Sequence, residues 1–201
     1  MTEKLKGIAG SMFSGKTEEL IRLIERSEYA KRTILVFKPK LDDRWGEVDK
    51  IRSHSGKEWE AFPAQTPADI LEFVLNYIET LPKPDMIFID EIQFFDDSIV
   101  EAVEAILELD IPVTYTGLST DFRGEPFGSM PTLLSLSDEI NRTTAICNTC
   151  GNEATKTQRL INGKPANYTD PIILIGDKEQ YEARCPKHHV VPGKPKPIFK
   201  K

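Results

Sequence analysis

The chain has 201 residues, of which 39% are hydrophobic, and it carries 26 Lys and Arg against 32 Asp and Glu, a net charge of -6. This length and hydrophobic content are enough for a buried core, which excludes a wholly disordered chain. No apolar run approaches the ~18 residues of a membrane span, and the acidic balance argues against a partner that is nucleic acid. We therefore expect a soluble cytoplasmic protein with no nucleic-acid or membrane partner.

The first third of the chain alternates strand and helix patterns. A short apolar run ends in Gly10, and the segment after it repeats apolar residues at helical spacing. A long polar and charged stretch then predicts a surface loop with a possible function. The predicted elements are a strand at 5–9, a helix at 17–30, a strand at 33–37, a loop at 38–56 and a short strand at 58–62.

The middle of the chain continues the alternation with stronger signals. Thr66 is a plausible N-cap and Pro67 suits the first helical position, so a helix is predicted over 66–81. The strands read as continuous apolar runs, which is typical of a parallel sheet covered by helices on both faces. Such folds bind ligands at the carboxyl ends of their strands. The remaining elements are a strand at 85–91, a helix at 96–110 and a strand at 111–118.

After about residue 140 the pattern changes to short strands joined by turns, which predicts a small β module. We expect strands at 143–147, 153–160 and 171–177, with turns at 148–152 and 162–167. The predicted organisation is therefore an α/β nucleotide-binding domain over 1–140, a small β domain over 141–191, and a Pro- and Lys-rich tail over 192–201 that we expect to be disordered.

The segment "GSMFSGKT" fits the phosphate-binding pattern G-x-x-x-x-G-K-[ST], and it lies between a predicted strand and a predicted helix. In this context backbone N–H groups cradle phosphate oxygens, a lysine approaches the β and γ phosphates, and a hydroxyl can bind Mg²⁺. The simpler alternative, a glycine turn that caps a helix, does not explain the Lys-Thr pair. The predicted ATP-binding residues are Gly10, Ser11, Met12, Phe13, Ser14, Gly15, Lys16 and Thr17.

A pair of carboxylates follows the apolar strand "MIFI". Asp90 can hold the Mg²⁺ shell, and Glu91 can accept a proton from an attacking nucleophile. A solvated turn is the alternative for such a pair, but the phosphate loop in the same chain favours the functional interpretation. These motifs leave the acceptor open among water, a protein, a sugar hydroxyl and a nucleoside.

The three cysteines and a histidine pair predict a structural zinc site. Cys147 and Cys150 form C-x2-C, and Cys185 with His188 repeats the spacing. An odd number of cysteines suits a metal better than a disulfide framework, and four protein ligands leave zinc no open position for a substrate. His189 is the competing fourth ligand, and we favour His188, with His189 solvated or outside the ligand set.

Several of these motifs together resemble one family. "GSMFSGKT", "DEIQFF", "DFRGEPFG" and the two C-x2-[CH] pairs are similar to the type II thymidine kinases, over about residues 7 to 188. The resemblance implies a P-loop (RecA-like) core and a zinc-binding lasso domain that closes over the nucleoside. It also implies a homotetramer, feedback inhibition by dTTP, and transfer of phosphate from ATP with Mg²⁺ to thymidine, which salvages the nucleoside for DNA synthesis.

Carried over to this chain, the resemblance makes Glu91 the general base that deprotonates the 5′-OH. Asp42 and Arg44 match a D-x-R pattern near the phosphates, for which an exposed salt-bridging loop is the alternative, and Gln93 joins the ATP and Mg²⁺ site. Relatives usually have Asp where this chain has Ser119, so no role is carried over to Ser119. His54 is expected to be solvated.

The resemblance also implies the nucleoside pocket. A planar pyrimidine suits an apolar slot with aromatic faces, although Phe94 and Phe127 would otherwise read as core residues. A lasso strand at 172–176 would bind the thymine edge through its main chain. The implied substrate-binding residues are Met12, Phe94, Leu118, Phe122, Phe127, Thr157, Ile173, Leu174, Ile175, Gly176 and Tyr181.

Two other classes of function remain as alternatives. A P-loop ATPase with a zinc ribbon acting on nucleic acid would use Glu91 to activate water, but the acidic composition and the lack of a basic stripe with interleaved aromatics argue against it. A non-catalytic nucleotide-binding regulator is disfavoured by the presence of Lys16, Asp90 and Glu91. The sequence does not separate thymidine from deoxyuridine as the acceptor.

Overall fold

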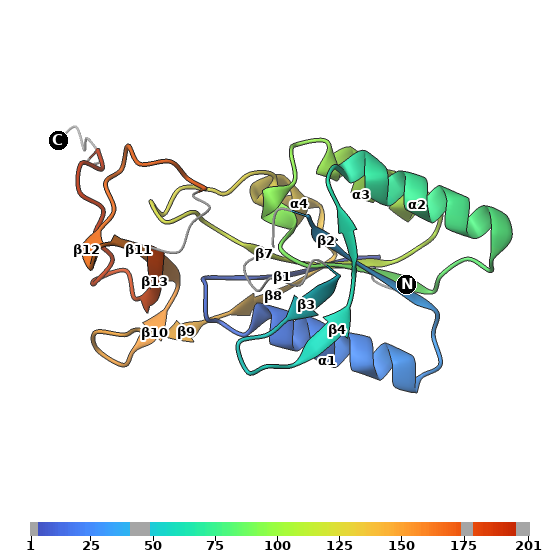
Figure 1. The fold of residues 1–201 in the computed structure, drawn as a ribbon, viewed down its shortest axis with the longest axis horizontal. Helices are drawn as coiled ribbons and strands as arrows, with labels where there is room; N and C mark the ends of the chain where they lie inside the picture. The colour runs from blue at the N-terminus through green and yellow to red at the C-terminus, as the bar shows by residue number, and fades with distance from the viewer. Residues whose placement is uncertain (1–3, 41–48, 174–178, 196–201) are drawn as a thin grey trace.

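The computed structural model describes residues 4–40, 49–173 and 179–195, and its centre is a six-stranded sheet (Figure 1). The strands lie in the order β5-β2-β6-β7-β1-β8, and every neighbouring pair is parallel. This confirms the predicted α/β class. The strands are β1 Leu5–Gly10, β2 Ile34–Pro39, β5 Phe62–Ala64, β6 Met86–Ile89, β7 Val113–Leu118 and β8 Glu139–Thr143.

Helices cover both faces of the sheet (Figure 1). One face carries α1 Lys16–Tyr29, with the hairpin of β3 Lys50–Arg52 and β4 Glu58–Glu60 beside it. The other face carries the remaining helices, which are α2 Pro67–Thr80, α3 Ile99–Glu108 and α4 Met130–Leu136. The helices that the sequence predicted are therefore present, and the elements that it did not predict include α4, β3 and β8.

Side chains on the central strands alternate between two buried cores. Phe37 and Ile89 pack toward α2 and α3, whereas Val36 and Phe88 pack toward α1. Successive residues of a strand point to opposite faces, so a strand with helices on both sides must be apolar at every position. This explains the continuous apolar runs that were read as parallel strands.

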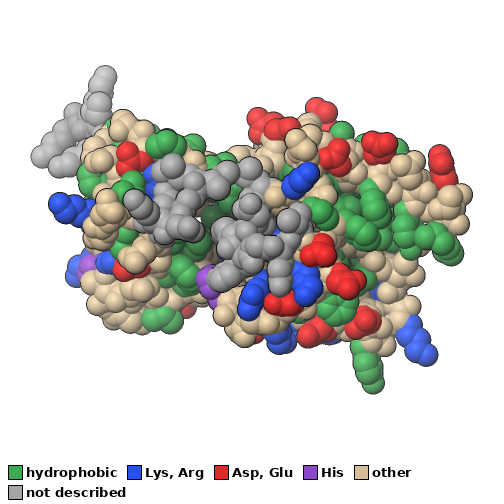
Figure 2. All heavy atoms as spheres, viewed as in Figure 1, with side chains coloured by type: hydrophobic (Ala, Val, Ile, Leu, Met, Phe, Trp, Pro, Cys, Tyr) green, Lys and Arg blue, Asp and Glu red, His purple; other side chains and the backbone are tan. Residues whose placement is uncertain are grey.

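Helix α2 begins where the sequence predicted. The hydroxyl of Thr66 accepts from the Asp69 N–H, and the Asp69 carboxylate accepts from the Thr66 N–H, which makes a capping box. Pro67 follows at the first helical position, where its missing N–H costs no hydrogen bond. On the face shown in Figure 2, Asp and Glu side chains are spread over the region of α2 and α3, in keeping with the acidic composition.

A small antiparallel module follows β8 and lies beyond one end of the main sheet (Figure 1). Its contacts with the loop after β1 place it at the carboxyl end of the strands. Strand β8 of the main sheet ends at Thr143, past the expected boundary at residue 140. The module contains β9 Ala145–Ile146, β10 Glu153–Ala154, β11 Lys156–Ile161, β12 Lys164–Pro165 and β13 Glu179–Arg184.

Some predicted features fall outside the described residues. These are Asp42, Arg44, Leu174, Ile175 and Gly176, and with them most of the strand expected at 171–177; residues 171–173 lie in no strand. Pro192 and Lys194, from the expected tail, make hydrogen bonds with Tyr168 and Arg123, while residues 196–201 are not described. Among the described helices, none combines the length and the apolar character that crossing a membrane requires.

Candidate functional site

The phosphate-binding loop connects β1 to α1. Gly15 adopts a left-handed conformation with φ of 80° directly before α1, which glycine does without steric cost. Gly10 lies so close to β8 that a Cβ there would meet the Thr143 carbonyl oxygen at 2.5 Å. The loop therefore needs glycine at both ends, once for conformation and once for space.

The polar side chains of the loop converge on its centre. The Lys16 side chain is buried, and its Nζ donates to the Ser11 carbonyl at 2.9 Å. The Thr17 hydroxyl donates to the Asp90 carboxylate at 3.2 Å. The lysine and the hydroxyl of the motif thus lie next to the first carboxylate at the end of β6, as a nucleotide with Mg²⁺ requires.

Thr116 of β7 links the Asp90 carboxylate to the backbone of Glu91. Its hydroxyl donates to Asp90 and accepts from the Glu91 N–H at 3.2 Å, and the residue is fully buried. This bridge fixes the backbone of Glu91 relative to the Asp90 side chain. The sequence analysis did not identify Thr116, because a single threonine within an apolar strand carries no functional signal.

Glu91 is held in an unusual conformation. Its φ of 49° is left-handed, which is uncommon for a residue other than glycine, and such conformations are enriched at functional sites. The Gln93 side chain donates through Nε2 to the Glu91 carboxylate and accepts the Leu118 N–H at 3.0 Å. Because an N–H can only donate, Leu118 sets which end of the Gln93 amide faces Glu91. The Glu91 carboxylate is therefore oriented by a chain of hydrogen bonds in which each donor and acceptor is determined.

Glu91 and the phosphate loop share one cavity of about 240 Å³. A larger cavity of about 520 Å³ lies at the amino ends of β1, β6 and β7 and contains none of the motif residues, so the smaller one is the candidate site. His54, expected to be solvated, is exposed but packs its ring 4.7 Å from that of Phe13. The candidate site is lined by Met12, Phe13, Gly15, Lys16, Thr17, Glu18, Arg52, Ser53, His54 and Glu91.

Met12 lines this cavity, whereas the other described residues implied for the nucleoside pocket are not part of its lining. The Met12 N–H donates to the Thr157 hydroxyl at 3.1 Å, which ties the phosphate loop to β11 of the small module. Phe94 and Phe127 meet edge to face with ring centroids 5.8 Å apart. The Leu118 N–H donates to the Gln93 side chain, and Phe122 is buried. Tyr181 of β13 pairs with Arg159 of β11, and Ile173 is exposed.

Two further residues of β11 were missed by the sequence analysis. Gln158 is buried, donates to the Val190 carbonyl and accepts the Val190 N–H. Arg159 is fully buried, with its guanidinium 3.9 Å from the ring centroid of Phe122. In the sequence they follow Thr157 in an ordinary strand pattern, and only the fold shows that the chain's C-terminal segment and Phe122 lie against them.

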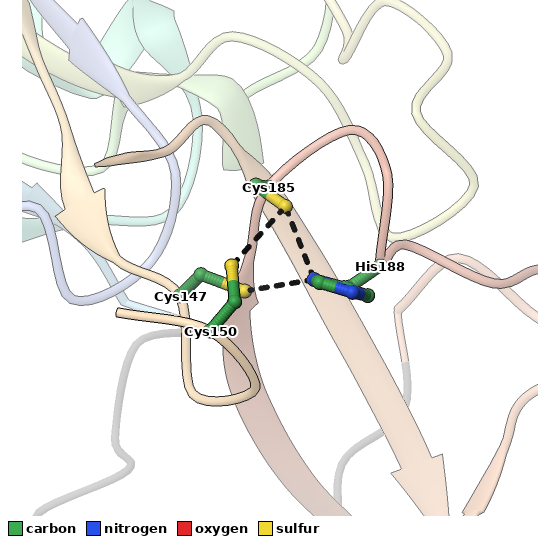
Figure 3. Close-up of side chains that lie close together, drawn as sticks. All are labelled: Cys147, Cys150, Cys185 and His188. Atoms are coloured by element: carbon green, nitrogen blue, oxygen red, sulfur yellow. Dashed lines mark hydrogen bonds between the residues drawn. The ribbon is translucent and has the colours of Figure 1, made fainter. Parts of the chain in front are cut away.

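The three cysteines and His188 converge at the base of the module (Figure 3). Their ligand atoms lie within 4.8 Å of one another. The Cys150 and Cys185 sulfurs are 3.8 Å apart, and the His188 Nδ1 lies 3.8 Å from Cys147 and 3.4 Å from Cys185. Tetrahedral zinc with ~2.3 Å bonds to sulfur separates two sulfurs by about 3.8 Å. The cluster therefore has the donor set and the dimensions of a zinc site.

The surroundings of Cys147 favour its thiolate. Burial alone would raise the pKa of Cys147, but N–H groups of Cys185, Thr149 and Cys150 outweigh it and lower the pKa to about 5. Zinc binds cysteine as the thiolate. His189 points elsewhere, and its Nε2 donates to the Phe122 carbonyl at 2.8 Å. The structure thus brings His188 to the sulfurs and His189 to the loop that carries Phe122.

The parallel sheet, the loop after β1 and the contact of Thr17 with Asp90 define a P-loop nucleotide-binding protein. Comparison with known proteins is more specific. The family model for thymidine kinase matches residues 3–189. The thymidine kinase of Coprothermobacter proteolyticus is 49% identical over 196 residues, which cover 98% of this chain and 95% of that relative. The chain belongs to the thymidine kinase family.

The solved structures also include a distant match. A crystal structure of a DNA replication initiation factor aligns with a TM-score of 0.40 and 9% identity, over 70% of this chain and 40% of that one. A likeness at this level carries no conclusion about this protein, and the family assignment is based on the sequence matches alone.

Proposed function

We propose that this protein transfers the γ-phosphate of ATP to the 5′-OH of thymidine and so forms dTMP and ADP. The observation that carries the proposal is that Glu91 opens onto the same cavity as Lys16 and Thr17. A base within the phosphate site suits transfer to a hydroxyl group. Membership of the thymidine kinase family identifies that hydroxyl as one of a nucleoside.

The phosphate end of the site is assigned to the P-loop. Backbone N–H groups of residues 10–17 would surround the β and γ phosphates, and Lys16 would place its charge beside them. The Thr17 hydroxyl and the Asp90 carboxylate, 3.2 Å apart, would hold Mg²⁺. Bound Mg²⁺ would neutralise phosphate charge. Gln93, Asp42 and Arg44 complete this part of the proposal on the family pattern.

Glu91 is assigned as the base. The carboxylate would take the proton of the 5′-OH as its oxygen forms a bond to the γ-phosphorus, while the bond from phosphorus to the bridging oxygen breaks and ADP leaves. Gln93 donates to the carboxylate and so keeps it oriented toward the cavity. Precise orientation matters here, since a misplacement of ~1 Å can cost about 100-fold in rate.

The nucleoside is assigned to the space between the main sheet and the small module. Met12, Phe94, Leu118, Phe122 and Phe127 would supply its apolar walls, and Thr157 and Tyr181 polar contacts. The main chain of 173–176 would bind the thymine edge, as family membership suggests. The same reasoning supports a homotetramer and inhibition by dTTP.

The zinc site is proposed to be structural. Cys147, Cys150, Cys185 and His188 would supply all four ligands of a structural zinc ion, which would leave no position for a substrate. Zinc would join the loop after β9 to the end of β13. The three thiols are free rather than paired as disulfides, which suits a reducing compartment, and we therefore place the protein in the cytoplasm.

Incubation with ATP, Mg²⁺ and a panel of nucleosides tests the proposal, with products identified by mass spectrometry. We expect dTMP from thymidine and little product from purine nucleosides, and deoxyuridine in the panel measures selectivity. ADP and free phosphate without any phosphorylated nucleoside would contradict the proposal and favour an ATPase that activates water.

A further inference from the structure

Phe122, one of the aromatic residues assigned to the nucleoside pocket, is held from two sides by the small module. Arg159 packs on its ring and His189 donates to its carbonyl. Neither residue was predicted to take part in the function. The inference below rests on the proposed function, since it concerns how the nucleoside is positioned.

Arg159 connects the two segments expected to enclose the pyrimidine. Its guanidinium lies over the Phe122 ring at 3.9 Å, and its Nη1 donates to the carbonyls of Pro171 at 2.6 Å and of Ile172 at 3.4 Å. Pro171 and Ile172 lead directly into the segment assigned to the thymine edge. The Arg159 side chain therefore joins Phe122, an aromatic wall of the pocket, to the residues that lead into the segment assigned to the thymine edge.

The position of Arg159 on β11 determines which part of the molecule its side chain contacts. Thr157 and Arg159 are two residues apart, so their side chains lie on the same face of the strand. Thr157 contacts the phosphate loop through Met12, while Arg159 contacts Phe122. The same strand thus places the module against the phosphate loop at Thr157 and against Phe122 at Arg159.

The chemistry requires arginine at this position. A planar guanidinium can stack on an aromatic face and donate in its own plane at the same time, whereas a lysine ammonium is a compact charge without a plane. Burial strengthens the interaction with the ring, because no water competes for the cation. A lysine would keep the charge but lose the link between the ring and the two carbonyls.

We propose that Arg159 is a positioning residue that sets the affinity for the nucleoside by fixing Phe122 against Pro171 and Ile172. Arg159 does not touch the reacting atoms. Its loss is therefore expected to weaken thymidine binding and to leave ATP binding and the phosphate-transfer step largely intact.

The test compares Arg159→Met, Arg159→Lys and the control Arg142→Met, which replaces an exposed arginine of β8. Each purified protein is assayed for the KM of thymidine, the KM of ATP, kcat and zinc content, and thymidine binding is measured by calorimetry. For Arg159→Met we expect the thymidine KM and Kd to rise at least about tenfold, which corresponds to ~1.4 kcal/mol, with the ATP KM within about twofold. Arg159→Lys should recover less than half of the loss in binding free energy, and Arg142→Met should behave as the wild type.

Three results would overturn the inference. The first is a zinc-loaded Arg159→Met protein with unchanged thymidine KM and Kd. The second is an equal rise in both KM values, which would indicate a general structural role. The third is full recovery by lysine. If Arg159→Met does not fold, Arg159→Lys decides by the same measurements. A wild-type protein that phosphorylates no nucleoside would instead refute the proposed function, so the two failures are distinguishable.

Discussion

Gln93→Leu tests whether the orientation of Glu91 depends on the hydrogen-bond chain that runs from Leu118 through Gln93. Leucine is one atom shorter than glutamine and neither donates nor accepts, so the substitution removes both contacts at a buried position. Glu91 loses one fixed donor, and the Leu118 N–H loses its acceptor. The phosphate loop is not altered.

The expected magnitudes follow from these two contacts. A hydrogen bond to a charged group contributes ~1.5–3 kcal/mol, and a buried donor left unpaired costs ~1–3 kcal/mol. The buried leucine regains part of this through its apolar surface, so we expect the free energy of unfolding to fall by about 2–4 kcal/mol. For a chain of this size that lowers the Tm by roughly 5–15 °C. A mobile Glu91 should lower kcat about 10- to 100-fold while the ATP KM stays nearly constant.

The assay is steady-state kinetics at a temperature well below the Tm of the variant, together with thermal unfolding. Gln65→Leu, at an exposed glutamine, is the matched control and should change neither quantity. A Gln93→Leu protein with wild-type kcat would show that Glu91 needs no orienting partner. A rise in the ATP KM equal to the loss in kcat would show that the substitution disturbs the whole site.

Two other substitutions test the phosphate-binding loop and the zinc site. Gly10→Ala would bring a methyl group within 2.5 Å of the Thr143 carbonyl oxygen, so the loop or β8 must shift. We expect ATP binding, measured by calorimetry, to weaken at least about tenfold, a change of ~1.4 kcal/mol. Unchanged ATP affinity would contradict the steric argument. Cys150→Ser replaces one of the four ligands, and zinc measured by plasma emission should fall from about one per chain to a small fraction. Retention of full zinc after dialysis against a chelator would remove Cys150 from the ligand set.

Local chemistry explains why part of the molecule was predictable. The N-cap at Thr66, the glycines of the phosphate loop and the spacing of the cysteines are each determined by residues close together in the sequence. A short motif of this kind has one physical solution, which is why it can be read without the fold. The parallel sheet followed from apolar runs that helices on both faces require.

The remaining features depend on distant partners. Thr116 matters only because β7 lies beside β6, and Arg159 only because Phe122 lies beneath it. Strand β8 lies at the edge of the sheet and has a single apolar residue, Ile140, so it lacks the apolar run of the buried strands. Its parallel pairing with β1 could not be inferred from five residues of mixed character.

The central claim is that Glu91 activates a nucleoside hydroxyl at the P-loop site. Single-turnover transfer from ATP labelled at the γ-phosphate to thymidine tests it most directly, with the wild type and Glu91→Gln compared at saturating substrates. We expect labelled dTMP from the wild type, and from Glu91→Gln a transfer rate at least about 100-fold lower with ATP affinity unchanged. Transfer by Glu91→Gln at close to the wild-type rate would contradict the account.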